Sequence, residues 1–383
     1  MTYDVDTLRR TEFPWLLAED VIYLNNASTG PLPRRTVETL ADWARHRAVP
    51  HRISQQMEFG TLDVSRQLIA ELIGAHESEI AVATNTTFGL NLAAFSLPLE
   101  RGDVVLSPDR EFPANVYPWM QLAARRGVEY RRLPCDDGPL DVDRLSRELE
   151  DERVRVVTVS WVQFASGARV DLAALGKLCR DRGVFFVVDA IQGLGPLTLD
   201  LRSTPVDILA CGAQKWLLSP WGAGFVYVRR DLITQMTPHD VSWMAVRGSD
   251  DFTRLTNYDL TWRDDARKFE FVTLPYQEFA AMNATLELIQ ELGAANVAAY
   301  SQLLADRIVE WACARGDVML KTPSKPGQYA SVVSVCPPDA AAASARLSEA
   351  GVVHSFREGG IRLSAYFYNT VEEIERTLAI IGE

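Results

Sequence analysis

Cysteine and histidine are scarce in this sequence, and their spacing excludes several common kinds of site. The 383 residues include five cysteines and five histidines. The cysteines lie far apart, so no CxxC pair supports a zinc site or a disulfide framework. The histidines lack the spacing of metal ligands. We therefore expect no metal site, no disulfide and a cytoplasmic location.

Long apolar runs and an excess of positive charge are also absent. The N-terminal MTYDVDTLRR lacks the apolar segment of a secretory signal, and no run approaches membrane-spanning length. The formal net charge is −12, whereas a nucleic-acid partner would require a basic face. We expect neither a membrane nor a nucleic acid as a partner.

Two phosphate-binding motifs of nucleotide-binding folds are incomplete or missing. Residues 193–195 give GxG without the third glycine of the dinucleotide fingerprint, and GxxxxGK[ST] does not occur. We therefore reject a dinucleotide-binding fold and a P-loop nucleotide-binding fold.

The apolar runs that are present predict an α/β architecture. Strand-like runs at residues 79–84, 104–107, 154–160, 184–188 and 207–211 alternate with helical patterns. This alternation is typical of a mainly parallel sheet flanked by helices. The chain is long enough for a second, smaller α+β domain at its C-terminus. We expect an arm at 1–20 that packs with the small domain, a large domain at 21–268 and a small domain at 269–383.

Residues 184–228 contain the two strongest candidates for chemistry. One apolar run ends on Asp189, and the next leads to Lys215. Ligands of such sheets gather at the carboxyl ends of the strands. A desolvated lysine is a nucleophile for aldehydes, and a buried carboxylate can hold a protonated ring nitrogen. Taken alone, Lys215 could be an ordinary surface lysine and Asp189 an aspartate that caps a turn. Taken together, the two residues match a pyridoxal phosphate site, which needs an imine-forming lysine and an acid at the ring nitrogen.

Two other segments offer groups that could bind a ligand. Asn85-Thr86-Thr87-Phe88-Gly89 lies between a strand and a helix, where phosphate binds well, although a cluster that only caps the helix fits as well. Arg362 lies on a short apolar strand, where it could hold a carboxylate or form a structural ion pair. Arg357, in a polar loop, is a second candidate for the carboxylate.

Six segments in this order resemble the class V aminotransferase family of fold-type I pyridoxal phosphate enzymes. They are YLNNASTGP, TNTTFGLN, VVDAIQGLG, CGAQKWLLSPWGAGF, KFEFVTLP and IRLSAYFYNT. The family includes cysteine desulfurases, selenocysteine lyases, isopenicillin-N epimerases and kynureninases. The resemblance covers nearly the whole chain. It implies a fold like that of pyridoxal-phosphate-dependent transferases, pyridoxal 5'-phosphate as cofactor, an amino-acid substrate and a homodimer with shared active sites.

The resemblance also implies roles for residues around the cofactor. Lys215 would join the cofactor's aldehyde as a Schiff base, and Asp189 would pair with the ring nitrogen. Gln192 would contact the phenolic oxygen. Thr86 and Thr87 would hold the phosphate.

Further residues would act on the substrate or across the dimer. Thr273 is similar to the family's phosphate-binding threonine that comes from the other subunit. Arg362 is similar to the arginine that binds the substrate carboxylate, and Asn26 and Ala27 would lie in the substrate site.

Three positions depart from the family pattern. Gln214 stands where a histidine usually precedes the lysine, and it remains a plausible phosphate donor. Pro113 occupies the usual place of a ring-stacking histidine, so Phe112 is our substitute for that role. Gln163 would replace an asparagine near the phenolic oxygen, since Phe164 falls at that position.

A fourth departure concerns the reaction. Desulfurases carry a nucleophilic cysteine on a loop shortly before the substrate arginine, and here no cysteine follows Cys336. A persulfide-forming desulfurase is therefore disfavoured. We expect an aminotransferase or an epimerase that removes the Cα proton of an amino acid. A β-lyase without the persulfide cysteine and a catalytically inactive binding protein are the alternatives.

Overall fold

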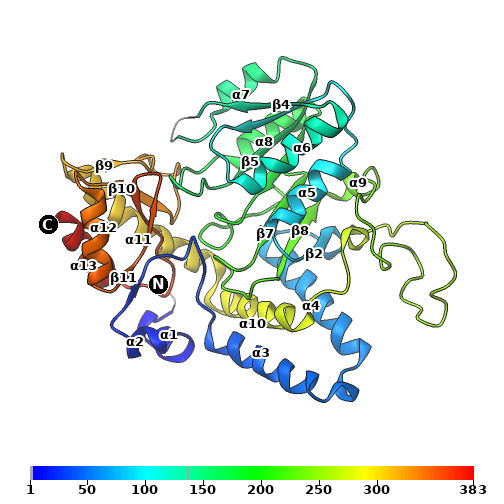
Figure 1. The fold of residues 1–383 in the computed structure, drawn as a ribbon, viewed down its shortest axis with the longest axis horizontal. Helices are drawn as coiled ribbons and strands as arrows, with labels where there is room; N and C mark the ends of the chain where they lie inside the picture. Colours follow the sequence, from blue (N-terminus) through cyan, green and yellow to red (C-terminus); the bar gives the residue numbers. More distant parts are fainter. Residues whose placement is uncertain (1–2, 136–137) are drawn as a thin grey trace.

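A seven-stranded sheet forms the centre of the protein (Figure 1). The computed structural model describes residues 3–135 and 138–383. The strand order is β2-β8-β7-β6-β5-β3-β4. The strands are β2 (Ile80–Ala83), β3 (Val104–Pro108), β4 (Glu129–Leu133), β5 (Val154–Ser160), β6 (Phe185–Asp189), β7 (Ile208–Gly212) and β8 (Gly224–Val228). Only β8 runs antiparallel to its neighbours. The predicted α/β fold with a mainly parallel sheet is confirmed.

Both faces of this sheet are buried. Phe186 and Val188 of β6 point into one apolar core, and Val187 between them points into another. Alternate residues of a strand face opposite sides, so a strand covered on both sides must be apolar throughout. This explains why the inner strands of this sheet appear in the sequence as continuous apolar runs, whereas the edge strand β4 is largely polar and partly exposed.

Helices on the two faces of the sheet supply the opposite walls of these cores. Side chains of α4, α7, α8 and α10 belong to the first core, and side chains of α5 and α6 belong to the second. The helices around the central sheet are α3 (Arg34–Arg47), α4 (Gln55–Ile73), α5 (Thr86–Ser96), α6 (Tyr117–Arg126), α7 (Val142–Glu148), α8 (Leu172–Asp181), α9 (Arg230–Ile233) and α10 (Tyr276–Leu292). Local signals set several starts: Ser54 caps α4 and Asp171 caps α8 through backbone N–H groups.

A smaller antiparallel sheet lies beside the central one, in the order β12-β13-β10-β9. Its strands are β9 (Met319–Leu320), β10 (Val333–Cys336), β12 (Ser355–Arg357) and β13 (Gly360–Leu363), and a separate parallel pair joins β1 (Ile22–Tyr23) to β11 (Val352–Val353). The nearby helices are α1 (Val5–Glu12), α2 (Trp15–Ala18), α11 (Ala294–Ala314), α12 (Ala340–Glu349) and α13 (Val371–Gly382). A third apolar core joins residues of this region to Trp216 and Leu218, just after Lys215. The chain thus enters the core of the smaller sheet directly after Lys215.

The N-terminal helices lie against the C-terminal part of the chain. Arg9 of α1 donates to Glu373 of α13 at 2.7 Å and to the Tyr368 carbonyl at 3.1 Å. Helix α10 packs mainly on α3 and α4. The predicted division into an arm and two domains remains a proposal.

No helix in the described parts of the chain is both long and apolar enough to cross a membrane.

Candidate active site

Asp189 and Lys215 lie beyond the carboxyl ends of two adjacent parallel strands. Asp189 is the last residue of β6 and pairs in register with Ala210 of β7. Lys215 follows β7 after two residues, Ala213 and Gln214. The side chain of Asp189 is almost fully buried, and its Oδ1 accepts the Ile191 N–H at 3.0 Å. Their charges influence each other, so the tertiary structure brings the two predicted residues into one site.

Burial shifts the pKa of both groups toward the neutral form. It raises the pKa of Asp189 to about 6, against the opposing effect of the Lys215 charge. It lowers the pKa of Lys215 to about 8, against the opposing effect of Asp189. A lysine amine with this pKa is partly neutral near physiological pH, so it can act as a nucleophile and a base.

Phe112 lies beside the lysine amine. The Lys215 Nζ is 5.7 Å from the centroid of the Phe112 ring, which in turn meets Phe164 edge to face at 5.3 Å. Phe112 is 41% exposed, so its ring is open to a ligand. The two rings give one side of the site an apolar wall.

A buried acid that sequence reasoning missed holds the Phe112 segment in place. The Glu111 carboxylate accepts the Ser160 N–H at 2.7 Å, the Ser160 hydroxyl at 2.5 Å and the Asn115 amide at 3.0 Å. Ser160 is the residue of β5 that pairs with Asp189 of β6. Glu111 therefore fastens the Phe112 segment to the strand beside Asp189. The sequence offered one signal, an acid within the otherwise largely uncharged EFPANVYPW segment.

The N-terminus of α5 lies at the end of β7. Asn85 caps the helix by accepting the Phe88 N–H at 2.9 Å. The buried Thr86 hydroxyl accepts the Gly212 N–H at 2.8 Å. A Cβ at Gly212 would lie 2.5 Å from the Oε1 of Gln214 and 3.2 Å from the Thr86 hydroxyl. Thr86, Gln214 and this glycine therefore gather at one point, whereas Thr87 is exposed one residue further on.

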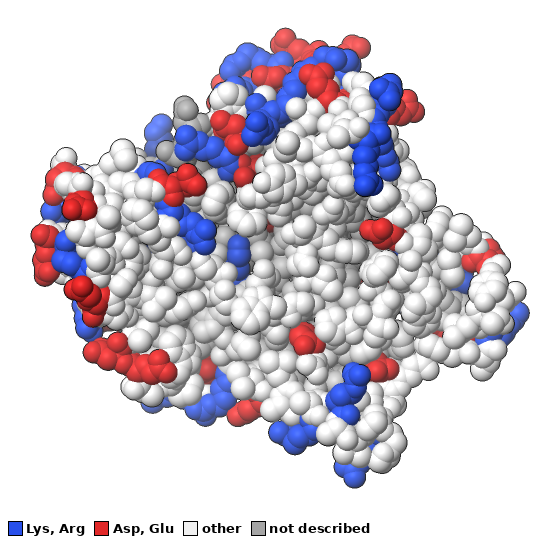
Figure 2. Space-filling view, viewed as in Figure 1, with Lys and Arg blue, Asp and Glu red and all other residues white. Residues whose placement is uncertain are grey.

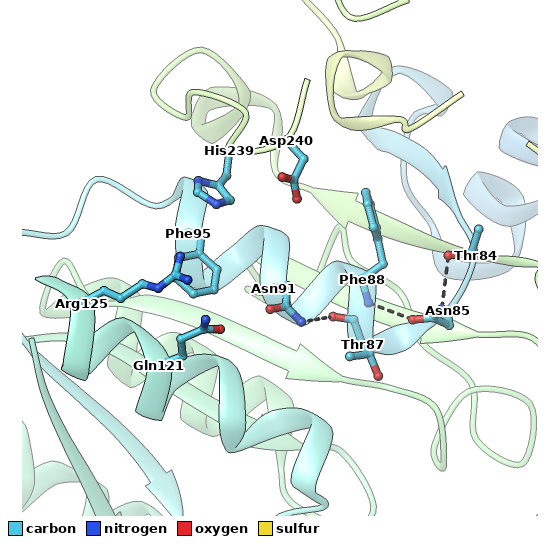
Figure 3. Close-up of a pocket in the computed structure, with 10 residues that line it drawn as sticks. All are labelled: Thr84, Asn85, Thr87, Phe88, Asn91, Phe95, Gln121, Arg125, His239 and Asp240. Atoms are coloured by element: carbon cyan, nitrogen blue, oxygen red, sulfur yellow. Dashed lines mark hydrogen bonds between the residues drawn. The ribbon is translucent and has the colours of Figure 1, made fainter. Parts of the chain in front are cut away.

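A pocket of about 440 Å³ opens next to this helix terminus (Figure 3). Thr87 is the one predicted site residue among those that line it, and Arg125 of α6 and His239 enter from other segments. The His239 ring stacks on Phe95 at 5.1 Å. Lys215, Asp189 and Arg362 do not line this pocket, so it is separate from the site that they form.

The amides of Gln163 and Gln192 already have protein partners. Gln163 donates to the Arg110 carbonyl at 2.8 Å and accepts two backbone N–H groups of its own turn. Gln192 donates to the Ala27 carbonyl at 3.0 Å and accepts from the Trp216 indole at 2.8 Å. Each amide keeps one N–H for a ligand. Their contact with the cofactor stays a prediction.

Asn26 and Ala27 connect the lysine segment to the small sheet. Asn26 is fully buried, donates to the Lys215 carbonyl at 3.3 Å and accepts from the Tyr368 hydroxyl at 2.8 Å. The Ala27 N–H donates to the Ser364 hydroxyl at 3.0 Å. These contacts orient the loop around Lys215.

Arg362 is the buried cation of the site. It is 2% exposed and lies on β13. Its Nη1 donates to the Phe164 carbonyl at 2.7 Å, and its Nη2 donates to the Ser28 hydroxyl at 2.7 Å and the Ser355 hydroxyl at 3.3 Å. Its Nε is buried without a hydrogen-bond partner in the described residues. Burial lowers the pKa of Arg362 to about 10, and the charge of Arg357 adds to this.

The two serines at Arg362 were not predicted as site residues. Ser28 lies within the YLNNASTGP segment, so that motif contained the signal for one of them. Ser355 lies on β12, far from any quoted motif, and its hydroxyl donates to Asn25 at 2.6 Å. Together they surround the guanidinium with neutral oxygens, and its positive charge has no counter-ion among the described residues.

Thr273 stands apart from the other predicted residues. It is exposed in the loop before α10, and its side chain makes no hydrogen bond within the described residues. Its predicted role at the phosphate of a partner subunit stays a prediction. No group of three or more His, Cys, Asp or Glu residues in the described chain could hold a metal ion.

Comparisons with known proteins agree on one family. The family described as Aminotransferase class-V matches residues 22–377. Isopenicillin N epimerase of Streptomyces clavuligerus is 31% identical over 381 residues, which covers 94% of each chain. A probable cysteine desulfurase of Halobacterium salinarum is 28% identical over 413 aligned positions, with 99% of this chain and 96% of the relative covered.

Solved structures agree on the fold. A mutant of C-DES with glycine covalently linked to its PLP cofactor superimposes with a TM-score of 0.88 at 24% identity, covering 98% of this chain and 99% of the other.

Proposed function

Because the chain belongs to the class V aminotransferase family, we propose that this pyridoxal-phosphate-dependent enzyme removes the Cα proton of an amino acid as an aminotransferase or an epimerase. The observation that carries the proposal is the arrangement of Lys215 and Asp189 at the ends of β7 and β6, with mutual charge effects.

The residues present fit the cofactor. Asp189 is buried and forms no salt bridge within the described chain, which suits a protonated ring nitrogen. The Thr86 hydroxyl and the N-terminus of α5 suit a phosphate at the point where Gly212 leaves no side chain. When bound, pyridoxal phosphate withdraws electrons from the Cα of the attached amino acid, which lowers the cost of its deprotonation.

The protein's own groups would divide the remaining work. The Lys215 amine, neutral above a pH of about 8, would accept the Cα proton. Arg362 would bind the substrate carboxylate. Its Nε has no hydrogen-bond partner and its charge has no counter-ion among the described residues, so both are available to an anionic group. Phe112 and Phe164 would keep water from one side of the reacting centre.

The hairpin before Arg362 supports a reaction without a persulfide. Only Glu358 and Gly359 connect β12 to β13, so no loop is present there to carry a cysteine. Cys336 lies on β10 instead, and its thiol donates to the Gly359 carbonyl at 3.3 Å.

We also propose a cytoplasmic homodimer in which Thr273 reaches the partner's phosphate site. Trp221, Tyr258 and Phe271 are 73%, 90% and 53% exposed. Figure 2 shows a broad area with few charged residues in the middle of one face. Large uncharged surfaces with exposed aromatic side chains are typical of protein interfaces. The cytoplasmic location is supported by the absence of disulfides among the described cysteines.

The test begins with the purified protein and pyridoxal phosphate. Borohydride should attach the cofactor to Lys215, and Lys215→Ala should prevent this and abolish turnover. A panel of L- and D-amino acids, assayed for keto acid, racemisation, sulfide and ammonia, then separates the reactions. Pyruvate and ammonia from β-substituted substrates would instead indicate a β-lyase. Light scattering should give a dimer, and a monomer with full activity would refute the shared site.

A further inference from the structure

The face of the small sheet that bears Arg362 has a second guanidinium. In the β12–β13 hairpin Ser355 lies opposite Arg362, and Arg357 lies opposite Gly360. Residues directly opposite each other share a face, and so do residues two positions apart on one strand. Arg357, Ser355 and Arg362 therefore lie on one face. The 3.3 Å contact between the Ser355 hydroxyl and the Arg362 guanidinium agrees with this geometry.

These cations have no acidic partner in the part of the chain that the structure describes. Arg362 bonds only to neutral oxygens. Arg357 is exposed and forms no ion pair or side-chain hydrogen bond in the described chain. Lys321 donates to the carbonyl of Glu358 in the turn between the strands. Glu358 is the one carboxylate of this turn, and no salt bridge joins it to Lys321 or Arg357 among the described residues.

The charge of Arg357 acts within the active site. It contributes to lowering the pKa of Lys215 and that of Arg362. Arg357 is also the diagonal neighbour of Arg362 across the hairpin, a spacing that long side chains can bridge. The strand register therefore places both guanidinium groups within reach of one ligand that carries two carboxylates.

Gly360 lies opposite Arg357 and two residues before Arg362 on the same face. A Cβ there would lie 2.6 Å from the Ser334 hydroxyl, so the absence of a side chain lets β10 pack closely behind the two arginines. Figure 2 shows positively charged residues between the regions of the two sheets on this side of the molecule. A second anionic group would find a charged partner here without displacing a protein carboxylate.

We propose that the substrate is an α-amino acid with a second carboxylate on its side chain, which Arg357 binds while Arg362 binds the α-carboxylate. This inference rests on the proposed function, because it takes Arg362 as the α-carboxylate site. Lys321 holds the hairpin turn that presents Arg357. A charged hydrogen-bonded pair contributes roughly 1.5–3 kcal/mol, or about 10- to 100-fold in affinity.

The first experiment measures amino-acid binding to the holoenzyme from the change in cofactor absorbance. L-2-Aminoadipate or L-glutamate should bind at least about 10-fold more tightly than the neutral analogues L-norleucine and L-glutamine. Arg357→Gln should remove this preference and leave the affinity for the neutral analogues unchanged, and Arg357→Lys should restore part of it. Arg376→Gln on α13, an exposed arginine elsewhere, serves as the matched control and should keep the preference.

The second experiment keeps the inference testable if the proposed chemistry fails. Glutarate has two carboxylates and no amino group, so its binding, measured by calorimetry, does not depend on any reaction. It should bind more tightly than butyrate, and Arg357→Gln should abolish the difference. Equal affinity for acidic and neutral analogues in the wild type would overturn the proposal. An equal loss for both in Arg357→Gln would overturn it too, because Arg357 would then bind the α-carboxylate.

Discussion

The amine of Lys215 lies 5.7 Å from the centroid of the Phe112 ring. The ring is partly exposed and also meets Phe164 edge to face, so its exposed part can pack against a planar ligand beside the lysine. Phe112 therefore remains our candidate for the ring that stacks on the cofactor, in place of the histidine whose usual position Pro113 occupies.

Replacement of this ring should weaken cofactor binding. Stacked aromatic pairs contribute roughly 0.5–1.5 kcal/mol beyond burial, so Phe112→Ala should raise the dissociation constant of pyridoxal phosphate by up to about 10-fold. Phe112→Tyr should restore it. Fluorescence titration of the apoprotein measures both values. Phe356→Ala removes a ring of similar exposure, 50% against 41%, from β12 and should have no effect; an equal loss in both variants would show that Phe112 does not stack.

Glu111 should make stability depend on pH. Burial raises its pKa from 4.5 to about 7. The folded state then keeps a proton that the unfolded state loses, so the stabilising contribution of this group falls as the pH rises through that window. The free energy of unfolding of the wild type, relative to Glu111→Gln, should therefore fall between pH 4.5 and 7. Urea denaturation at several pH values measures it.

Glu129 provides the contrast for that experiment. Its hydrogen bond to Arg131 lowers its pKa, so it contributes stability that is lost only as the pH falls toward that lowered value. Glu129→Gln should show no decline relative to wild type between pH 4.5 and 7. If the wild type and Glu111→Gln respond to pH in parallel, the carboxyl group of Glu111 does not titrate in this range.

Arg362→Ala should mainly affect substrate binding. Loss of a charged hydrogen-bonded partner costs roughly 1.5–3 kcal/mol, so KM for amino acids should rise about 10- to 100-fold while cofactor affinity changes little. Steady-state kinetics and a cofactor titration separate the two effects. Since Arg362 also bonds to Phe164 and Ser28, thermal unfolding should confirm that the variant is folded. An unchanged KM would place the α-carboxylate elsewhere.

Cys336→Ser should retain at least about half of the wild-type activity. The thiol lies on β10 and donates to a backbone carbonyl, a role that a serine hydroxyl can take over. Turnover of each active amino acid and mass spectrometry of the protein after exposure to L-cysteine measure the outcome. A protein-bound sulfur atom that disappears with Cys336→Ser would point to a desulfurase instead.

The sequence alone determined the strands and the order of the motifs. The run that was predicted at 154–160 is β5, and the run that ends on Asp189 is β6. These predictions succeed because a strand buried on both faces must be apolar along its whole length, and that requirement is local. The pair Asp189 and Lys215 suggested the cofactor, and the resemblance of six segments suggested the family.

Only the tertiary structure decided which groups surround each candidate. Ser28 and Phe164 reach Arg362 from segments more than 190 positions away, and Glu111 finds Ser160 across the sheet. No local pattern encodes such contacts, because they depend on how loops fold back over strand ends. For the same reason the position of Arg357 relative to Arg362 could not be predicted, because in the sequence Arg357 is one charge in a polar loop. The pairing of β12 with β13 sets it beside Arg362 on a face without an acid to neutralise it.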